Sequence, residues 1–279
     1  EMGPLLRIEP AGLLYIKVKV EDCEEIIEES IINDRVIERL VYHDQEGKAY
    51  EKQEEIPFYK QQTRVALEDC GRINAESIKE YIAVGGYSAV AKALFDMTPQ
   101  QIVDEISEAS LRGRGGGGFP TGRKWAQVLA QDSEIKYVVC NGDEGDPGAF
   151  MDRSMMEGDP HRVIEGMLIA GIATGAHYGY IYVRAEYPLA VERLQTAIQK
   201  AEEKGLLGKN ILNSGFDFDL KISQGAGAFV CGEGSALTAS IEGNRGMPRV
   251  KPPRTVEKGL FEKPTVLNNV ETYCNVPPI

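Results

Sequence analysis

The sequence predicts an α/β fold with a mostly parallel sheet, and three observations support this prediction. Between residues 136 and 243, short apolar runs typical of strands alternate with longer segments of helical periodicity. Several helices are marked by a proline at the start or a glycine at the end. Polar and glycine-rich stretches come directly after the apolar runs, where parallel strands end and ligands bind.

The expected elements of this region follow from these patterns in chain order. A helix is expected after Thr98, because a capping threonine and Pro99 at the first helical position are a strong start signal. Glycine ends that helix and the one that begins at Pro188. The full prediction is a helix over 98–113, a strand over 136–141, a helix over 161–176, a strand over 178–187, a helix over 188–205, a strand over 216–224 and a helix over 235–243.

The N-terminal part predicts strands on both sides of a turn at residues 10–12, followed by an acidic helix over 21–34. In that helix, Ile27 and Ile31 are expected to form the apolar face. One or two strands and a helix are too few to fold alone. We therefore expect four parts: the end of a domain that begins earlier (1–45), a connector with helices (46–97), the α/β domain (98–250), and a proline-rich extended segment that leads into a missing domain (251–279).

Composition excludes several classes of protein. A net charge of −12 argues against a nucleic-acid binder. No apolar run approaches the roughly 18 residues that a membrane span requires, and no signal peptide opens the chain. The cysteines form no C-x-x-C pair, so we expect each to be a small buried hydrophobe in a cytoplasmic protein. The histidines share no motif and are assigned no role. The cysteines are Cys23, Cys70, Cys140, Cys231 and Cys274.

The stretch "LRGRGGGGFPTGRKW" (111–125) predicts an anion-binding loop. It matches G-x-G-x-x-G from Gly113, but a helix is expected before it, whereas a dinucleotide fingerprint follows a strand. A triphosphate-binding loop is also excluded, because Gly122 is followed by Arg-Lys-Trp. Consecutive glycines still allow several N–H groups to point at one anion, beside the start of the next helix. A flexible surface loop is the alternative.

Three further motifs offer polar groups. "CNGDEGDPGAFMDR" (140–153) follows a strand and presents carboxylates that suit ribose or ring N–H groups, with a Mg²⁺ or Ca²⁺ site as the alternative. "GAGAFVCGEGSAL" (225–237) exposes backbone and places Glu233 before a helix, with Ser235 as the expected cap. The last motif is "PRVKPP" (248–253) with "PTVLNNVET" (264–272), in which the amides of Asn268 and Asn269 can both donate and accept. Four such motifs predict a large ligand rather than ordinary turns.

Together these motifs resemble the family of flavin-carrying NADH dehydrogenase subunits. That family includes the NADH-oxidising subunit of respiratory complex I and matching subunits of NAD-linked hydrogenases and formate dehydrogenases. The resemblance covers about residues 57–279. It implies a Rossmann-like domain in which FMN and NADH share one cavity and hydride passes from the nicotinamide to the flavin. Residues 1–45 resemble the end of the thioredoxin-like [2Fe–2S] domain of hydrogenase-type members.

The resemblance also implies roles for individual residues. Catalytic roles fall on Glu144 and Glu233. FMN contacts are implied for Gly113, Arg114, Gly115, Gly117, Lys124, Asn141, Asp143, Gly232, Glu233, Asn268 and Asn269. NADH contacts are implied for Phe119, Glu144, Phe229 and Lys251. No metal ligand is expected in this segment. The [4Fe–4S] and [2Fe–2S] clusters would lie elsewhere in the full-length protein or in partner subunits, namely a thioredoxin-like [2Fe–2S] partner and a cluster-rich electron-transfer or hydrogenase partner.

Five positions depart from the family pattern. Gly117 and Gly142 stand where alanines are common, which is a mild change, and the other three lie on the NADH side. Gly234 stands where a second glutamate is common, and Gln127 and Arg254 stand where phenylalanines are common. These departures leave two alternatives open. One is an electron-relay or scaffold subunit that holds flavin without using NADH. The other is a nucleotide-binding enzyme without flavin.

Overall fold

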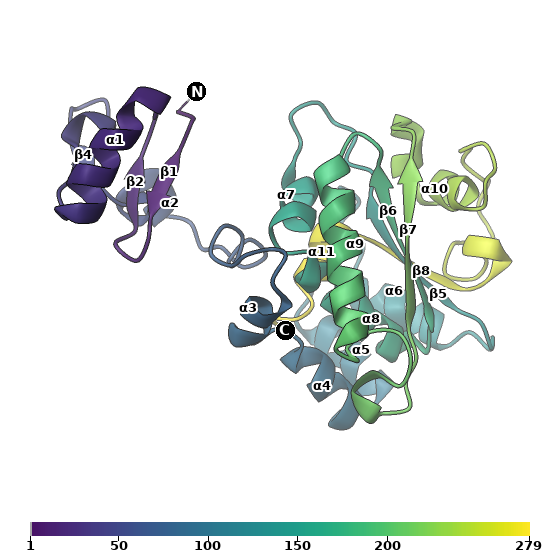
Figure 1. Cartoon of the computed structure of the whole chain (residues 1–279). Coiled ribbons are helices and arrows are strands. Elements are labelled where there is room, and N and C mark those ends of the chain that lie inside the picture. The colour runs from purple at the N-terminus through teal and green to yellow at the C-terminus, as the bar shows by residue number, and fades with distance from the viewer. Residues whose placement is uncertain (1) are drawn as a thin grey trace. The chain divides into compact units, whose positions relative to one another are not determined.

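The computed structural model describes residues 2–279, and the chain divides into two compact units that meet in sequence between Arg64 and Val65 (Figure 1). The division falls later than the expected boundary at residue 45. The reason is a small antiparallel pair, β3 (Tyr42–His43) with β4 (Ala49–Tyr50), which spans that boundary. Residues 46–64 therefore belong to the first unit rather than to a connector.

The first unit is built on an antiparallel pair, β1 (Leu6–Ile8) with β2 (Leu13–Tyr15). A continuous helical segment follows, in which the 3₁₀ turn η1 (Val20–Asp22) leads into α1 (Cys23–Glu25) and then into the π-helix η2 (Ile26–Ile32). Leu13, Tyr15 and Ile26 lie in its small core. The remaining elements are η3 (Glu38–Leu40), η4 (Gln53–Glu55) and α2 (Pro57–Lys60).

Two expectations for this unit were wrong. Ile27 and Ile31 are 52% and 62% exposed, and the buried face of the helix carries Ile26 and Ser30 instead. The hydroxyl of Tyr15, on β2, lies 2.6 Å from Ser30 Oγ. This contact explains why the helix face that carries Ser30 is the one that packs on the strands. Cys23 is exposed on the same helix and is not a buried hydrophobe.

The second unit contains a four-stranded parallel sheet in the order β7–β6–β5–β8, which confirms the predicted fold class (Figure 1). Val138 and Ile181 point into the main core with the helices α8 and α9, whereas Val139 and Tyr182 pack on the opposite face with Leu237 of α10. The strands are β5 (Tyr137–Gly142), β6 (Tyr178–Arg184), β7 (Asp219–Gly225) and β8 (Thr265–Asn269).

Helices complete this unit, and several begin where the sequence predicts. Thr98 and Gln101 form a capping box at the start of α5, with Pro99 at its first position. The α-helices are α3 (Ile78–Ala83), α4 (Ser88–Phe95), α5 (Pro99–Glu108), α6 (Thr121–Leu129), α7 (Met151–Gly158), α8 (Pro160–Thr174), α9 (Pro188–Glu203), α10 (Gly234–Ile241) and α11 (Val270–Cys274). The 3₁₀ turns are η5 (Ile211–Asn213), η6 (Phe229–Gly232) and η7 (Leu260–Glu262). Among residues 2–279, no helix has the length and apolarity needed to cross a membrane.

The segment 251–279 is not simply extended, and this is the main correction to the predicted fold. β8 pairs in parallel with β5, so that Asn268 lies opposite Cys140 and Asn269 opposite Asn141. The turn α11 then packs on α8. β8 was missed for two reasons. Its hydrogen bonds are made with β5, more than a hundred residues earlier in the chain, and its short sequence comes after several prolines and ends in polar residues. The short helix α7 was also not expected.

Replacing Gly166 with alanine is expected to destabilise this unit by about 1–3 kcal/mol. Gly166 lies on α8, and a Cβ atom there would be 2.1 Å from the carbonyl oxygen of Tyr273 on α11. The two helices would have to separate. Thermal unfolding followed by fluorescence of Trp125, the single tryptophan, measures the effect. Gly117→Ala is the matched control, since a Cβ at Gly117 meets no atom within 4 Å.

Candidate functional site

A cavity of about 730 Å³ opens at the carboxyl ends of β5 and β8. Its size lies in the range of small-molecule and cofactor sites, and its place in the sheet is where open α/β folds bind ligands. The loops after α5, β5 and β7, the ends of β5 and β8, and the first turn of α7 form its wall. The lining residues are Arg114, Gly115, Gly116, Asn141, Asp143, Glu144, Gly145, Asp146, Ala149, Asp152, Phe229, Val230, Gly232, Glu233 and Asn269.

The cavity brings together most of the residues implied by the resemblance. Those on its wall are Arg114, Gly115, Asn141, Asp143, Glu144, Phe229, Gly232, Glu233 and Asn269. Residues implied but outside the lining are Gly113, Gly117, Phe119, Lys124, Lys251 and Asn268. The wall therefore draws on all four sequence motifs, although they are up to about 150 residues apart.

The glycine loop is held against the β8–α11 junction. The backbone N–H of Arg114 donates to Thr272 Oγ1 at 2.9 Å. A Cβ on Gly115 would lie 3.1 Å from Asn269 Cβ, so the close approach of loop and strand depends on a missing side chain. Gly113 N–H donates to the Phe119 carbonyl at 2.9 Å and closes the loop. Phe119 itself is 41% exposed, with the Arg123 guanidinium 5.9 Å from the centre of its ring.

Asp143 presents two buried acceptors with no hydrogen-bond donor among the described residues. Its side chain is fully buried, and both Oδ atoms lack a hydrogen-bond partner. The nearest cation is Arg184, whose Nη1 lies 3.7 Å from Oδ1. Burial raises the pKa of Asp143, and Arg184 opposes that rise. Buried acceptors of this kind are normally satisfied, so they fit the N–H or O–H groups of a ligand.

Asn141 links the same loop to η6. Its Oδ1 accepts from Asp143 N–H at 3.0 Å, and its Nδ2 donates to the Gly232 carbonyl at 3.0 Å. Asn141 therefore fixes both Asp143 and the glycine-rich turn across the cavity.

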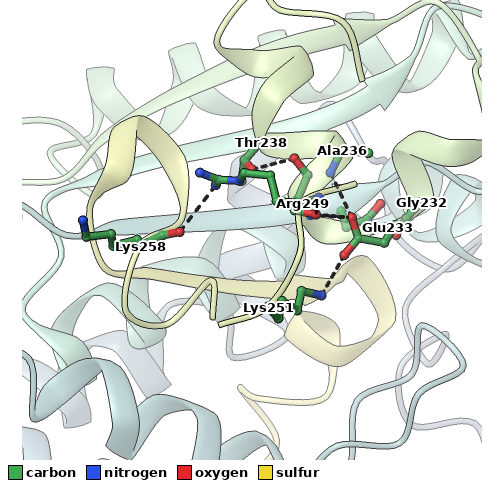
Figure 2. Close-up of polar contacts among 9 residues, drawn as sticks. Gly232, Glu233, Ala236, Thr238, Arg249, Lys251 and Lys258 are labelled. Carbon is green, nitrogen blue, oxygen red and sulfur yellow. Dashed lines mark hydrogen bonds and ion pairs between the residues drawn. The ribbon is translucent and has the colours of Figure 1, made fainter. Parts of the chain in front are cut away.

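Glu233 is a paired carboxylate at the start of α10. Its Oε2 accepts from the N–H groups of Ser235 and Ala236, and its Oε1 lies 2.8 Å from Lys251 Nζ (Figure 2). Partial burial would raise the pKa of Glu233, but the hydrogen bonds from Lys251, Ser235 and Ala236 lower it to about 2. Glu233 is thus the helix cap, where Ser235 was expected; the Ser235 hydroxyl instead accepts from Arg249 N–H at 2.8 Å.

Glu144 accepts hydrogen bonds from the backbone of α7. Its two carboxylate oxygens accept from the N–H groups of Asp152 and Arg153, each at 3.1 Å. A carboxylate at this position stabilises the first turn of α7. Glu144 thus positions α7 beside the cavity.

Lys124 and Asn268 lie behind the wall. Lys124 Nζ donates to the Leu267 carbonyl at 2.6 Å, and burial lowers the pKa of this lysine to about 8. Asn268 Oδ1 accepts from Trp125 Nε1 at 3.2 Å, whereas its Nδ2 is buried with no hydrogen-bond partner among residues 2–279. Both residues tie α6 to β8 and so hold the glycine loop in place.

Asp152 is the main site residue that the motifs did not single out. It lies in the first turn of α7, lines the cavity and accepts from Asn269 Nδ2 at 2.5 Å. It falls within the stretch 140–153, but α7 was not expected, so nothing in the sequence indicated that Asp152 turns toward the cavity. Gly116 and Val230 also line the wall without having been singled out.

A parallel sheet with a ligand cavity at its strand ends, walled by a glycine loop and by buried carboxylate and amide groups, defines a cofactor-binding α/β domain. Comparison with known families agrees. The chain belongs to the family described as the Nuo51 FMN-binding domain, whose profile matches residues 106–278. The resemblance inferred from the motifs is therefore confirmed.

Individual relatives carry related names. The chain is 56% identical over 220 residues to HndC, an NADP-reducing hydrogenase subunit of Solidesulfovibrio fructosivorans, covering 79% of this chain and 44% of the relative. It is 54% identical over 201 residues to an NADH-quinone oxidoreductase subunit of Aquifex aeolicus, covering 72% and 47%. The chain spans about half the length of the curated relatives it matches.

A solved structure supports the same fold. The NAD⁺-reducing [NiFe]-hydrogenase in its H₂-reduced state superposes with a TM-score of 0.65 at 29% identity. The match covers all of this chain and 43% of the hydrogenase chain.

Proposed function

We propose that this chain binds FMN in the cavity and oxidises NADH, whose electrons then pass singly to iron–sulfur clusters of partner subunits. The host would be a complex I-like assembly, an NAD-linked hydrogenase or a formate dehydrogenase, located in the cytoplasm. The observation that carries the proposal is Asp143, a buried carboxylate whose two oxygens lack hydrogen-bond donors at the wall of a cofactor-sized cavity. Family membership and the names of the relatives support the choice of flavin.

The residues on the wall fit FMN. The backbone of Arg114 and Gly115 suits a phosphate or a flat ring that passes close to the chain. Asp143 suits donors on the flavin ring or the ribityl chain. Asn268, whose Nδ2 lacks a partner, and Asn269 supply amide groups from β8. Bound FMN supplies the chemistry that accepts a hydride and releases electrons one at a time.

The chain's own task is to orient the cofactors. Lys251 holds Glu233 as a charged carboxylate, so this wall keeps a fixed ion pair over the neutral pH range. Phe119 and Phe229 are 41% and 69% exposed and offer aromatic faces on which an adenine could stack. The acceptor clusters are assigned to partners or to other parts of the full-length protein. Within residues 2–279, no three Cys, His, Asp or Glu side chains are placed to hold a metal.

Anaerobic mixing of NADH with the FMN-loaded chain tests the proposal. We expect the visible absorption of the flavin to be lost when NADH is added. The same experiment with NADPH decides which nucleotide is used. An FMN-loaded chain that keeps its colour with both nucleotides contradicts NADH oxidation, and a chain that binds no FMN contradicts the flavin assignment.

One observation favours a flavin-holding relay as the second candidate. Gly234 removes a carboxylate next to Glu233, and a Cβ there would lie 3.3 Å from Leu267 Cδ1, so the local packing is adapted to glycine. A relay would bind FMN but not respond to NADH. If the missing carboxylate is the reason, Gly234→Glu is expected to make the flavin reducible by NADH, whereas in an NADH oxidase the wild type already reduces it and the variant changes only the rate.

A further inference from the structure

Asp152 and Asn269 form a buried contact at the edge of the cavity. Asp152 is 7% exposed, and its Oδ2 accepts from Asn269 Nδ2 at 2.5 Å. The Glu271 N–H is shared between Asn269 Oδ1, at 3.0 Å, and Asp152 Oδ1, at 3.3 Å. The carboxamide is therefore held at both ends, with its amino group on Asp152 and its oxygen on the start of α11. Rotating the amide by 180° would place its oxygen against the carboxyl group, so Asp152 determines which face Asn269 presents to a ligand.

Two carboxylates and a neutral thiol act on Asp152 from three elements. Glu144 faces it from the loop after β5, Glu271 faces it from α11, and the buried thiol of Cys140 lies beside it on β5. The nearby cation Arg114 lies 3.9 Å from Glu271 and forms no ion pair with Asp152. Burial, and then the charge of Glu144, raise the pKa of Asp152 to about 7, although the hydrogen bonds from Asn269 and from the Glu271 N–H oppose the rise.

The cavity as a whole is acidic. Its lining carries one cation, Arg114, and five carboxylates, of which Glu233 is paired with Lys251 and Asp143 with Arg184 from just outside the lining. The remaining carboxylates are Glu144, Asp146 and Asp152. FMN brings a further negative phosphate, largely doubly charged at neutral pH. A phosphate bound in a cavity of this size lies within about the 8–10 Å over which salt screens a charge. Ligand binding therefore adds negative potential at Asp152, which is buried and lies beside the charge of Glu144.

We propose that Asp152 is a positioning residue of this cavity, which fixes the Asn269 carboxamide and takes up one proton from solvent when the anionic cofactor binds. The proton goes to Oδ1, whose contact with the Glu271 N–H is the longer of the two, so Oδ2 still accepts from Asn269 Nδ2 and the amide orientation survives while the charge disappears. This inference rests on the proposed binding of FMN and adds a protonation step to it.

Calorimetric titration of the flavin-stripped chain with FMN tests the inference without any turnover. At pH 7.5, in two buffers of different ionisation enthalpy, the wild type is expected to take up about half a proton or more per FMN bound. Its affinity is expected to fall on the order of tenfold between pH 6.5 and pH 8.5. Riboflavin, which lacks the phosphate, is expected to show a smaller uptake.

Variants separate positioning from charge. Asp152→Asn has the shape of the protonated acid, so it is expected to bind FMN without proton uptake and with an affinity that varies little over this pH range. Asp152→Ala loses the acceptor for Asn269 and is expected to bind more weakly at every pH. Asp146→Asn removes an exposed carboxylate from the same cavity and is expected to retain the uptake.

The outcomes of these titrations distinguish the role of Asp152 from the proposed binding of FMN. FMN binding without proton uptake in the wild type, or with unchanged uptake in Asp152→Asn, overturns the role of Asp152 and leaves FMN binding standing. Failure of the wild type to bind either FMN or riboflavin overturns the proposed function, and the inference with it. Circular dichroism of each variant establishes that a weaker binder is still folded.

Discussion

Replacing Asp143 with alanine is expected to weaken FMN binding roughly ten- to a hundredfold. A hydrogen bond to a charged group contributes about 1.5–3 kcal/mol, and about 1.4 kcal/mol corresponds to a factor of ten. The Asp143 side chain is fully buried, and both of its oxygens lack hydrogen-bond donors among residues 2–279. In the ligand-free chain the ion pair with Arg184, at 3.7 Å, offsets only part of the cost of burying this carboxylate, so donors on a ligand recover the rest. Quenching of flavin fluorescence on titration with the stripped chain measures the affinity.

A neighbouring carboxylate provides the matched control for Asp143. Asp146 lies three residues further along the same loop, lines the same cavity and is exposed. Asp146→Ala is expected to change the affinity for FMN by no more than about twofold, because solvent already satisfies an exposed carboxylate. A folded Asp143→Ala variant that binds FMN as tightly as the wild type would show that Asp143 does not contact the cofactor.

The predicted part of the fold is the part encoded by local patterns. β5, β6 and β7 were predicted because each is an apolar or alternating run with a turn or helix signal beside it. β8 carries the same kind of core residue, Val266, but it is five residues long and ends in Asn268 and Asn269. Its strand conformation depends on pairing with β5, and no local pattern specifies that partner. The order of the strands in the sheet is undetermined for the same reason.

The candidate site divides in a similar way. Glycines and clustered carboxylates are conspicuous in sequence, and Gly115, Asp143 and Glu233 do lie on the cavity wall. Lys124 carries the kind of charge that would suit a phosphate, yet its ammonium group is used inside the protein, on the Leu267 carbonyl. No sequence pattern indicated Asp152, because the direction of its side chain depends on α7. The first turn of that helix is capped by Glu144 through a tertiary contact. Sequence thus indicates which groups are available, whereas packing decides which of them face the ligand.

Replacing Glu165 with alanine is expected to cost about 3–5 kcal/mol of stability, far from the cavity. Glu165 lies on α8 and is 2% exposed. It accepts from the Tyr81 hydroxyl at 2.5 Å and from the N–H groups of Tyr87 and Val90 at 2.8 and 3.3 Å. These two amides belong to the start of α4, whose first-turn donors have no partner within the helix. Alanine would leave three buried donors unsatisfied, at about 1–3 kcal/mol each before relaxation.

Thermal and urea unfolding followed by Trp125 fluorescence measures this loss in the second unit. Glu105→Ala makes the same change on a surface helix, where Glu105 pairs with Lys92, and is expected to cost less than about 1 kcal/mol. Burial raises the pKa of Glu165 above its ordinary 4.5, despite the hydrogen bonds from Tyr81, Tyr87 and Val90. The folded state therefore holds this proton more tightly than the unfolded chain does. Relative to Glu165→Gln, the wild type should thus lose stability as the pH rises above 4.5. A constant difference across a pH series from acid to neutral would mean that Glu165 does not change its ionisation on folding.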